Sequence, residues 1–137
     1  MILFHVNISD AEICRQISYR EIFELKIAYK VWLDNDGKAF GEGPYQLLKK
    51  IETTGSLHQA AIEMKMSYRK AWTTLKNIET RLGFPLLERK IGGIAGGGSQ
   101  ITKQGYNLMR HYEEFRTSLK EELQNLYEKH FGYLSNK

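Results

Sequence analysis

Two short amphipathic segments joined by a very short turn constrain the fold of this chain more than any other feature. Residues 55–82 carry one apolar stripe at helical spacing in each half, which predicts two consecutive α-helices. The stripes consist of Leu57, Ala60, Ala61 and Met64, and of Ala71, Leu75, Ile78 and Leu82. Ser56 and Ser67 precede the two halves, where each hydroxyl can cap a helix N-terminus. Because the small Ala60 and Ala61 allow two backbones to approach closely, we predict a helix-turn-helix.

The second predicted helix has an open polar face with its cations toward the N-terminal half. In a helix-turn-helix, the N-terminal residues of this helix reach base edges in the DNA major groove, and flanking cations hold phosphates. The candidate base contacts are Tyr68, Arg69, Lys70, Thr73 and Thr74. An ordinary amphipathic helix pair with a solvated polar face would show the same pattern, and these residues alone leave that alternative open.

Positive charge is concentrated in the same part of the chain. The whole chain has a formal net charge of +4, whereas residues 56–103 hold eight cations and three anions. A basic segment that coincides with a helix-turn-helix is the electrostatic footprint of a DNA-binding protein. The candidate contacts to the DNA backbone are Ser56, Ser67, Lys76, Arg89, Lys90, Ser99, Gln100 and Lys103.

A β-hairpin is predicted before the helices. Residues 23–33 alternate between apolar and polar side chains, which predicts a strand with one buried face. The turn signal of residues 35–38 and a return strand at residues 39–40 follow. Pro44 suits the first turn of a supporting helix that ends near Gly55. Residues 1–20 are compatible with a short helix or a loose arm.

A second hairpin is predicted directly after the helix-turn-helix, where a wing would lie. Gly83 and Pro85 stop the second helix. Residues 86–91 and 99–101 predict two strands around the glycine-rich tip at residues 92–98. Such a tip can approach a sugar-phosphate chain closely. A plain surface hairpin is the alternative, and a nucleotide-binding loop is disfavoured because no lysine follows the glycines.

A long helix is predicted at the C-terminal end, with Thr102 as its cap and its end near His130 or Phe131. A helix of roughly thirty residues is long for a domain of this size, so part of its apolar stripe should lie beyond the core. We predict that the stripe packs on its two-fold mate in a homodimer, with packing on its own core as the alternative. The stripe consists of Leu108, Tyr112, Phe115, Leu119, Leu123 and Leu126.

No catalytic or metal-binding constellation stands out in the sequence. The four histidines are scattered and none has a metal-ligand spacing. We therefore expect no enzyme, no cofactor and no metal. Trp72 lies beside the core face of the second helix, where a filler at the core edge is favoured over a base-stacking residue. The single cysteine, Cys14, suits a reducing cytoplasm, and no apolar run approaches the ~20 residues of a membrane span.

Together these elements predict an α+β, mainly α fold. It is a winged helix-turn-helix with an N-terminal β-hairpin and a long C-terminal dimerisation helix. The expected boundaries are residues 1–22 for an arm or short helix, 23–103 for the DNA-binding domain and 104–137 for the dimerisation helix.

Residues 55–72, G-S-L-x-x-A-A-x-x-M-x-M-S-Y-R-K-A-W, strongly resemble the DNA-binding domain of the ModE-type molybdate-responsive transcription regulators. L-G-F-P-L-L-E-R at residues 82–89, the glycine-rich tip and I-T-K-Q-G-Y at residues 101–106 extend the resemblance. F-G-E-G at residues 40–43 resembles the short, stand-alone members, and the helix-turn-helix also resembles the wider LysR-type class. The resemblance implies a dimeric transcription regulator that binds double-stranded DNA in a sequence-specific manner.

The resemblance does not extend to molybdate. ModE-type regulators carry molybdate in a separate C-terminal β-barrel domain, for which we expect no room in this chain. Regulation by molybdate is therefore not carried over, and the effector is open. A winged-helix protein-interaction module and an oxyanion or small-molecule sensor at a dimer interface are the alternative functions.

Overall fold

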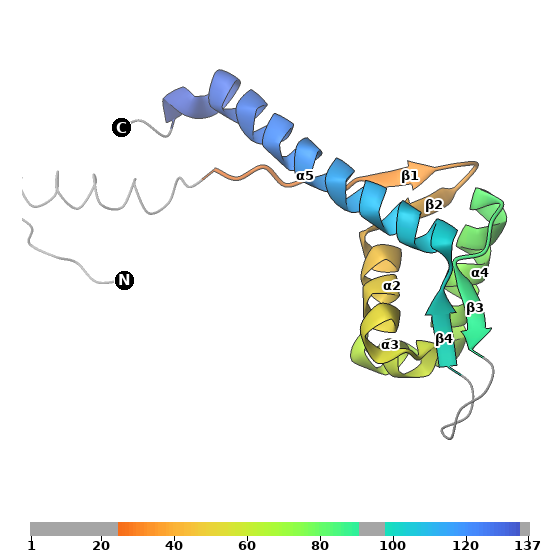
Figure 1. Ribbon diagram of the computed structural model, residues 1–137. Coiled ribbons are helices and arrows are strands. Elements are labelled where there is room, and N and C mark those ends of the chain that lie inside the picture. Colours follow the sequence, from red (N-terminus) through yellow and green to blue (C-terminus); the bar gives the residue numbers. More distant parts are fainter. Residues whose placement is uncertain (1–24, 91–97, 135–137) are drawn as a thin grey trace, which may run out of the picture. The chain divides into compact units, whose positions relative to one another are not determined.

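The computed structural model describes residues 25–90 and 98–134 of the chain. The chain divides into two compact units, residues 29–120 and a second unit that includes residues 121–137. The first unit contains two antiparallel two-stranded sheets and the helices between them (Figure 1). Its elements in order are β1 (Trp32–Asp34), β2 (Lys38–Gly41), α2 (Glu42–Thr54), α3 (Leu57–Glu63), α4 (Tyr68–Leu82), β3 (Leu87–Lys90), β4 (Gly98–Ile101) and the N-terminal part of α5 (Lys103–Phe131).

The helix-turn-helix is formed by α3 and α4, and both predicted caps are confirmed. The Ser56 hydroxyl accepts a hydrogen bond from the backbone N–H of Gln59 at 3.2 Å, at the start of α3. The Ser67 hydroxyl accepts one from the N–H of Lys70 at 3.1 Å, at the start of α4. Left-handed glycines, Gly55 and Gly83, end α2 and α4, as expected for a residue that adopts positive φ without strain.

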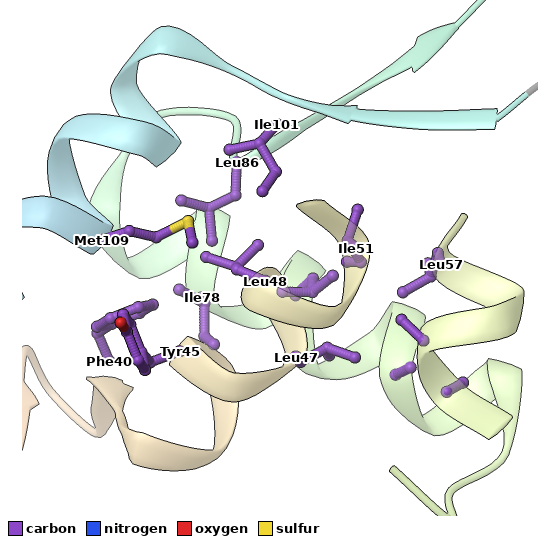
Figure 2. Close-up of a cluster of buried hydrophobic side chains, with 14 of the residues drawn as sticks. Phe40, Tyr45, Leu47, Leu48, Ile51, Leu57, Ile78, Leu86, Ile101 and Met109 are labelled. Carbon is purple, nitrogen blue, oxygen red and sulfur yellow. The ribbon is translucent and has the colours of Figure 1, made fainter. Parts of the chain in front are cut away.

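The core of this unit is built around α2, which inserts one apolar face between its neighbours (Figure 2). The predicted stripes of α3 and α4 face the same core, and Ala60 and Ala61 are almost completely buried between helices. The buried cluster consists of Phe40, Tyr45, Leu47, Leu48, Ile51, Leu57, Ala60, Ala61, Ala71, Leu75, Ile78, Leu86, Ile101, Met109 and Tyr112. The predicted mainly helical fold with a winged helix-turn-helix is confirmed.

The long first strand predicted for residues 23–33 is wrong. Residues 25–31 have no regular secondary structure, and β1 begins only at Trp32. The reason is the short return strand, because β2 ends at Gly41 and α2 starts at the next residue. Residues 25–31 therefore find no partner strand in β2, and the expected buried face is absent. Tyr29, Trp32 and Leu33 stay 40–49% exposed. Residues 1–24, including the predicted arm, lie outside the described residues.

The second hairpin matches the predicted wing in position. In the antiparallel pair β3–β4, Leu87 lies opposite Ile101 and Lys90 lies opposite Gly98. Leu86, predicted as part of the strand, is instead buried in the core, and its carbonyl oxygen accepts a hydrogen bond from the Thr102 N–H at 2.9 Å. Of the glycine-rich tip predicted at residues 92–98, only Gly98 is described, as the first residue of β4, because residues 91–97 lie outside the described residues.

The long helix α5 begins as predicted, because the buried Thr102 hydroxyl accepts a hydrogen bond from the Gly105 N–H at 2.9 Å. Its N-terminal part packs on the core through Met109 and Tyr112. The Tyr112 ring meets Phe40 edge-on with centroids 5.1 Å apart, and only 3% of the residue is exposed. The assignment of Tyr112 to a dimer interface is therefore wrong, because its own core already covers the ring. Leu108 is partly buried against the same core.

An ion pair fixes α5 on α2 within this unit. An Arg116 guanidinium nitrogen lies 2.7 and 2.9 Å from the two carboxylate oxygens of Glu42. The guanidinium also lies 4.7 Å from the centroid of the Tyr45 ring. Burial alone would raise the pKa of Glu42. The hydrogen bonds from Gln46 and Arg116 outweigh the effect of burial and hold the pKa below its usual value.

The second unit contains the C-terminal part of α5 and a short 3-10 helix, Gly132–Leu134. The rings of Tyr127 and Phe131 lie 6.0 Å apart on this part of α5. Across the described ranges of both units, no helix is long and apolar enough to cross a membrane.

Candidate nucleic-acid interface

The turn between α3 and α4 is short and held by backbone hydrogen bonds. Met66 N–H donates to the carbonyl oxygen of Ala61, and Lys65 N–H donates to that of Ile62, both at 3.0 Å. Lys65 adopts φ 56°, a conformation that costs an L-residue roughly 1–2 kcal/mol. Met64 and Met66 on either side pack against the core. The core contacts of the turn thus hold Lys65 in this conformation and fix the crossing of α3 and α4.

The exposed face of α4 presents most of the predicted base contacts together. Because Ala71, Leu75 and Ile78 face the core, the side chains between them point outward. Arg69, Lys70 and Thr73 are exposed, and Tyr68 is 49% exposed. Thr74 is half-buried at the edge of the core face, so it is the least available of the five. The Arg69 and Lys70 side chains have no hydrogen bond or ion pair with any described residue, which leaves both cations available to a ligand.

Lys76 lies on the same helix, but its ammonium group is already engaged. Its nitrogen lies 2.8 Å from a carboxylate oxygen of Glu79. The other carboxylate oxygen of Glu79 accepts hydrogen bonds from the N–H groups of Leu86 and Leu87, at 2.8 and 3.2 Å. Glu79 thus connects α4 to the start of β3. This role of Glu79 was not predicted from the sequence, where the only signal for it is the i,i+3 spacing of Lys76 and Glu79.

The carboxyl group of Glu79 is held in its charged form. Burial alone would raise the pKa of Glu79. The hydrogen bonds from Lys76, Leu86 and Leu87 and the charge of Lys76 outweigh that effect and keep the pKa below its ordinary value. The negative charge of Glu79 holds the ammonium group of Lys76 beside the carboxylate.

The base of the wing is seated at the junction of α2 and α3. The backbone N–H of Ser99 donates a hydrogen bond to the carbonyl oxygen of Gly55 at 2.9 Å. This contact brings β4 to the N-terminal end of α3, where Ser56 is the cap. Two of the predicted backbone contacts, Ser56 and Ser99, therefore lie at one junction, and both are half-buried.

The two cations of the wing point to opposite faces of the hairpin. Side chains alternate between the faces of a strand, so Arg89 lies on the face of Leu87 and Lys90 on the face of Glu88. Arg89 lies opposite Ser99 in the register, whereas Gln100 lies opposite Glu88. Lys90 and Gln100 thus share the face opposite to that of Leu87 and Ile101.

Lys103 is the first residue of α5, next to its capping residue Thr102. It is exposed and makes no ion pair with any residue in the described ranges. The N-terminus of a helix carries a partial positive charge, so the helix end and the Lys103 ammonium group both attract an anion.

Trp72 is not the core-edge filler that the sequence favoured. Its side chain is 47% exposed and lies outside both the buried cluster and the side chains packed against it. The ammonium group of Lys76 lies 5.9 Å from the centroid of the Trp72 ring. A ring exposed to this extent on α4, beside Tyr68 and Arg69, is a candidate ligand contact. At the N-terminal end of α4, the ring centroid of Tyr68 lies 6.1 Å from that of His58 in α3.

Comparison with known proteins matches this site to a family of regulators. Residues 45–105 match the model of the bacterial regulatory helix-turn-helix protein, lysR family. Transcriptional regulator ModE of Haemophilus influenzae is 41% identical over 68 residues, 50% of this chain and 27% of that protein. Molybdenum transport protein ModE of Azotobacter vinelandii is 33% identical over 98 residues, 71% of this chain and 36% of that protein.

The chain thus spans about a third or less of the length of these curated relatives. Among solved structures, a chain of the CbnR_DBD–DNA complex aligns with a TM-score of 0.48 and 17% identity. That alignment covers 61% of this chain and 90% of the other. Residues 45–105 thus match the helix-turn-helix model of the lysR family, and the chain is similar in sequence to transcription regulators named ModE.

Proposed function

We propose that this chain binds double-stranded DNA in a sequence-specific manner and regulates transcription. The observation that supports this most directly is the exposed N-terminal half of α4. There Arg69 and Lys70 stand without partners among the described residues, on a helix whose start is fixed by the Ser67 cap. The match of residues 45–105 to a regulatory helix-turn-helix family supports the same proposal.

In this proposal α4 lies in the major groove and contacts base edges. Arg69 suits guanine, because a guanidinium can bind O6 and N7 of that base together. The methyl group of Thr73 suits the C5-methyl of thymine. Tyr68 and Lys70 lie at the N-terminal end of α4, which enters the groove in this motif. Thr74 is the weakest member of the proposed set, because it is half-buried.

The DNA backbone would be held from several sides of the same unit. The backbone N–H groups near Ser56 and Ser67 lie at helix starts, which attract phosphate. Lys90 and Gln100 would contact the DNA backbone from one face of the wing, with Arg89 and Ser99 on the other face. Lys103 would contact phosphate at the start of α5. Lys76 would add a phosphate contact while it stays paired with Glu79.

We propose that the protein acts as a homodimer through α5. The predicted stripe continues beyond Tyr112 with residues that the described structure leaves exposed or half-buried. These are Phe115, Leu119, Leu123 and Leu126. Two recognition helices in a two-fold dimer contact half-sites about one helical turn apart, so the operator should be near-palindromic.

The proposed organisation keeps residues 23–103 as the DNA-binding part and 104–137 as the dimerisation helix, with an arm at residues 1–22. A regulator of this type works beside the DNA in the cytoplasm, and we assign it no catalytic activity. The effector is left open.

Binding of the purified protein to a pool of random and genomic duplexes, over a series of salt concentrations, tests the proposal. We expect enrichment of one near-palindromic site, with the logarithm of the binding constant falling linearly with the logarithm of the salt concentration. Weak and equal binding to all duplexes would contradict sequence-specific recognition. Binding to no duplex would favour a protein-interaction module instead.

A further inference from the structure

Trp72 is a large aromatic side chain of α4 that neither the core nor the proposed base contacts account for. Almost half of it is exposed, and it lies outside the buried cluster. Exposing an indole ring forgoes the free energy of its burial, so such a ring on a binding surface marks a contact site.

The position of Trp72 places it directly beside two of the proposed base contacts. Residues three and four apart are neighbours on the surface of a helix. Trp72 therefore adjoins Tyr68 and Arg69 on the N-terminal side and Lys76 on the C-terminal side. Tyr68 and Arg69 are proposed base contacts and Lys76 is a proposed phosphate contact, so Trp72 lies between the two kinds of contact.

The ring is also held in place before any ligand binds. The Lys76 ammonium group lies 5.9 Å from the ring centroid, within the range of a cation–π interaction. Lys76 in turn is paired with Glu79 at 2.8 Å, and Glu79 is bound to the backbone of β3. A side chain that is already ordered loses less rotamer freedom on binding, which favours affinity and specificity.

We infer that Trp72 is a specificity-determining residue that makes an apolar contact with the C5-methyl group of a thymine in the major groove. This inference rests on the proposed DNA binding. The thymine methyl group is the apolar feature of the major groove, and uncharged side chains with apolar surface recognise it. Stacking of the indole on a base is disfavoured, because the bases of a duplex are already stacked and one would have to be flipped out.

The test uses the full chain and the duplex that is enriched from the random pool. Each thymine in that duplex is replaced by uracil, one at a time, which removes only the C5-methyl group. Affinity is measured for the wild-type protein, Trp72→Gln and Trp32→Phe. Trp32 is the other tryptophan of the chain and is equally exposed in β1, so it is the matched control.

We expect the wild-type protein to lose affinity at one thymine per half-site, by roughly fourfold for the loss of one buried methyl group. Trp72→Gln should bind the thymine duplex less tightly and lose nothing further with uracil at that position. Trp32→Phe should discriminate as the wild type does. Circular dichroism checks that each variant is folded.

Each other outcome overturns the inference in a recognisable way. If Trp72→Gln keeps the full thymine-over-uracil preference, the contact does not exist, while the proposed DNA binding stands. A smaller oligomer mass for Trp72→Gln would assign the ring to a protein interface instead. If the wild-type protein binds no duplex, the proposed function itself fails.

The fluorescence of Trp72 gives an independent measurement. In Trp32→Phe, Trp72 is the single tryptophan of the chain. We expect its emission to change on titration with the enriched duplex and its quenching by acrylamide to decrease. Unchanged emission and quenching at saturating duplex would overturn the inference.

Discussion

The backbone N–H of Ser99 donates a hydrogen bond to the carbonyl oxygen of Gly55, 2.9 Å away, and this bond joins the wing to the helix-turn-helix. Gly55 ends α2 in the left-handed conformation, with its own N–H bonded to Ile51. The backbone of Gly98 also lies close to the Gly55 carbonyl. A Cβ added at Gly98 would lie only 2.6 Å from that oxygen. The position of the wing relative to α3 therefore depends on the close approach of two backbones.

We expect Gly98→Ala to destabilise the protein, because the added methyl group has no space beside the Gly55 carbonyl. Forcing an extra carbon into a packed site typically costs about 1–3 kcal/mol. The measurement is the free energy of unfolding from urea titration. Gly43→Ala is the matched control, because a Cβ on Gly43 meets nothing within 4 Å. Gly43 lies in the first turn of α2, where alanine should leave the stability unchanged or raise it by less than the ~1 kcal/mol of a helix interior. Equal stability of the two variants would contradict the packing argument.

Arg69→Ala tests direct recognition of a base. We expect the affinity for the preferred site to fall by about 1–3 kcal/mol, with loss of discrimination at one position, because the guanidinium has no partner in the described protein. The measurement is binding to the preferred duplex and to all its single-base variants. Arg110→Ala is the control, because Arg110 is an exposed cation of α5 paired with Glu114. An equal loss for every duplex would make Arg69 a phosphate contact.

The sequence was sufficient to predict the local elements near the site. The serine caps, the small alanine pair and the glycine stops all follow from local backbone chemistry, which short spacings reveal. Contacts between distant segments were not predictable in this way. The bond from Ser99 to Gly55 and the pairing of Glu79 with the start of β3 depend on how the hairpin docks.

The spacing of apolar residues in the sequence also does not show which part of the protein packs against an apolar face. The stripe of α5 is continuous in the sequence, yet Tyr112 packs into its own core against Phe40, whereas Phe115 is 43% exposed. The alternation in residues 25–31 likewise predicts a strand only if a partner strand is available. Because β2 ends at Gly41, that condition is not met.

Glu79→Gln should lower the stability of the protein at neutral pH. The amide keeps an acceptor for the N–H groups of Leu86 and Leu87 but loses the ion pair with Lys76, at a cost of about 1 kcal/mol. The folded-state pKa of Glu79 lies below its ordinary value of 4.5, so its contribution is present above that pH. The contribution disappears as the pH falls through the lowered pKa, where the carboxylate becomes protonated.

Urea unfolding of wild type and Glu79→Gln at neutral pH and at about pH 3 measures this difference. We expect the two proteins to differ at neutral pH and to converge in acid. Glu88→Gln is the control for the lost charge, because Glu88 is exposed on β3 and has no partner among the described residues. A difference between wild type and Glu79→Gln that does not change with pH would show that the charge of Glu79 contributes nothing.

Leu119→Asp tests the proposed homodimer. Leu119 lies on the apolar stripe of α5 beyond Tyr112 and is half-buried, so a carboxylate there would be desolvated in a helix–helix interface. We expect the molar mass from light scattering to fall from that of a dimer to that of a monomer. Ser118→Asp places the same charge at the neighbouring exposed position, off the stripe, and should leave the mass unchanged. Circular dichroism separates lost association from lost helix, and Leu126→Asp, nearly half exposed, provides a second variant with less effect on folding. If both stripe variants keep the wild-type dimer mass, the interface lies elsewhere on the chain.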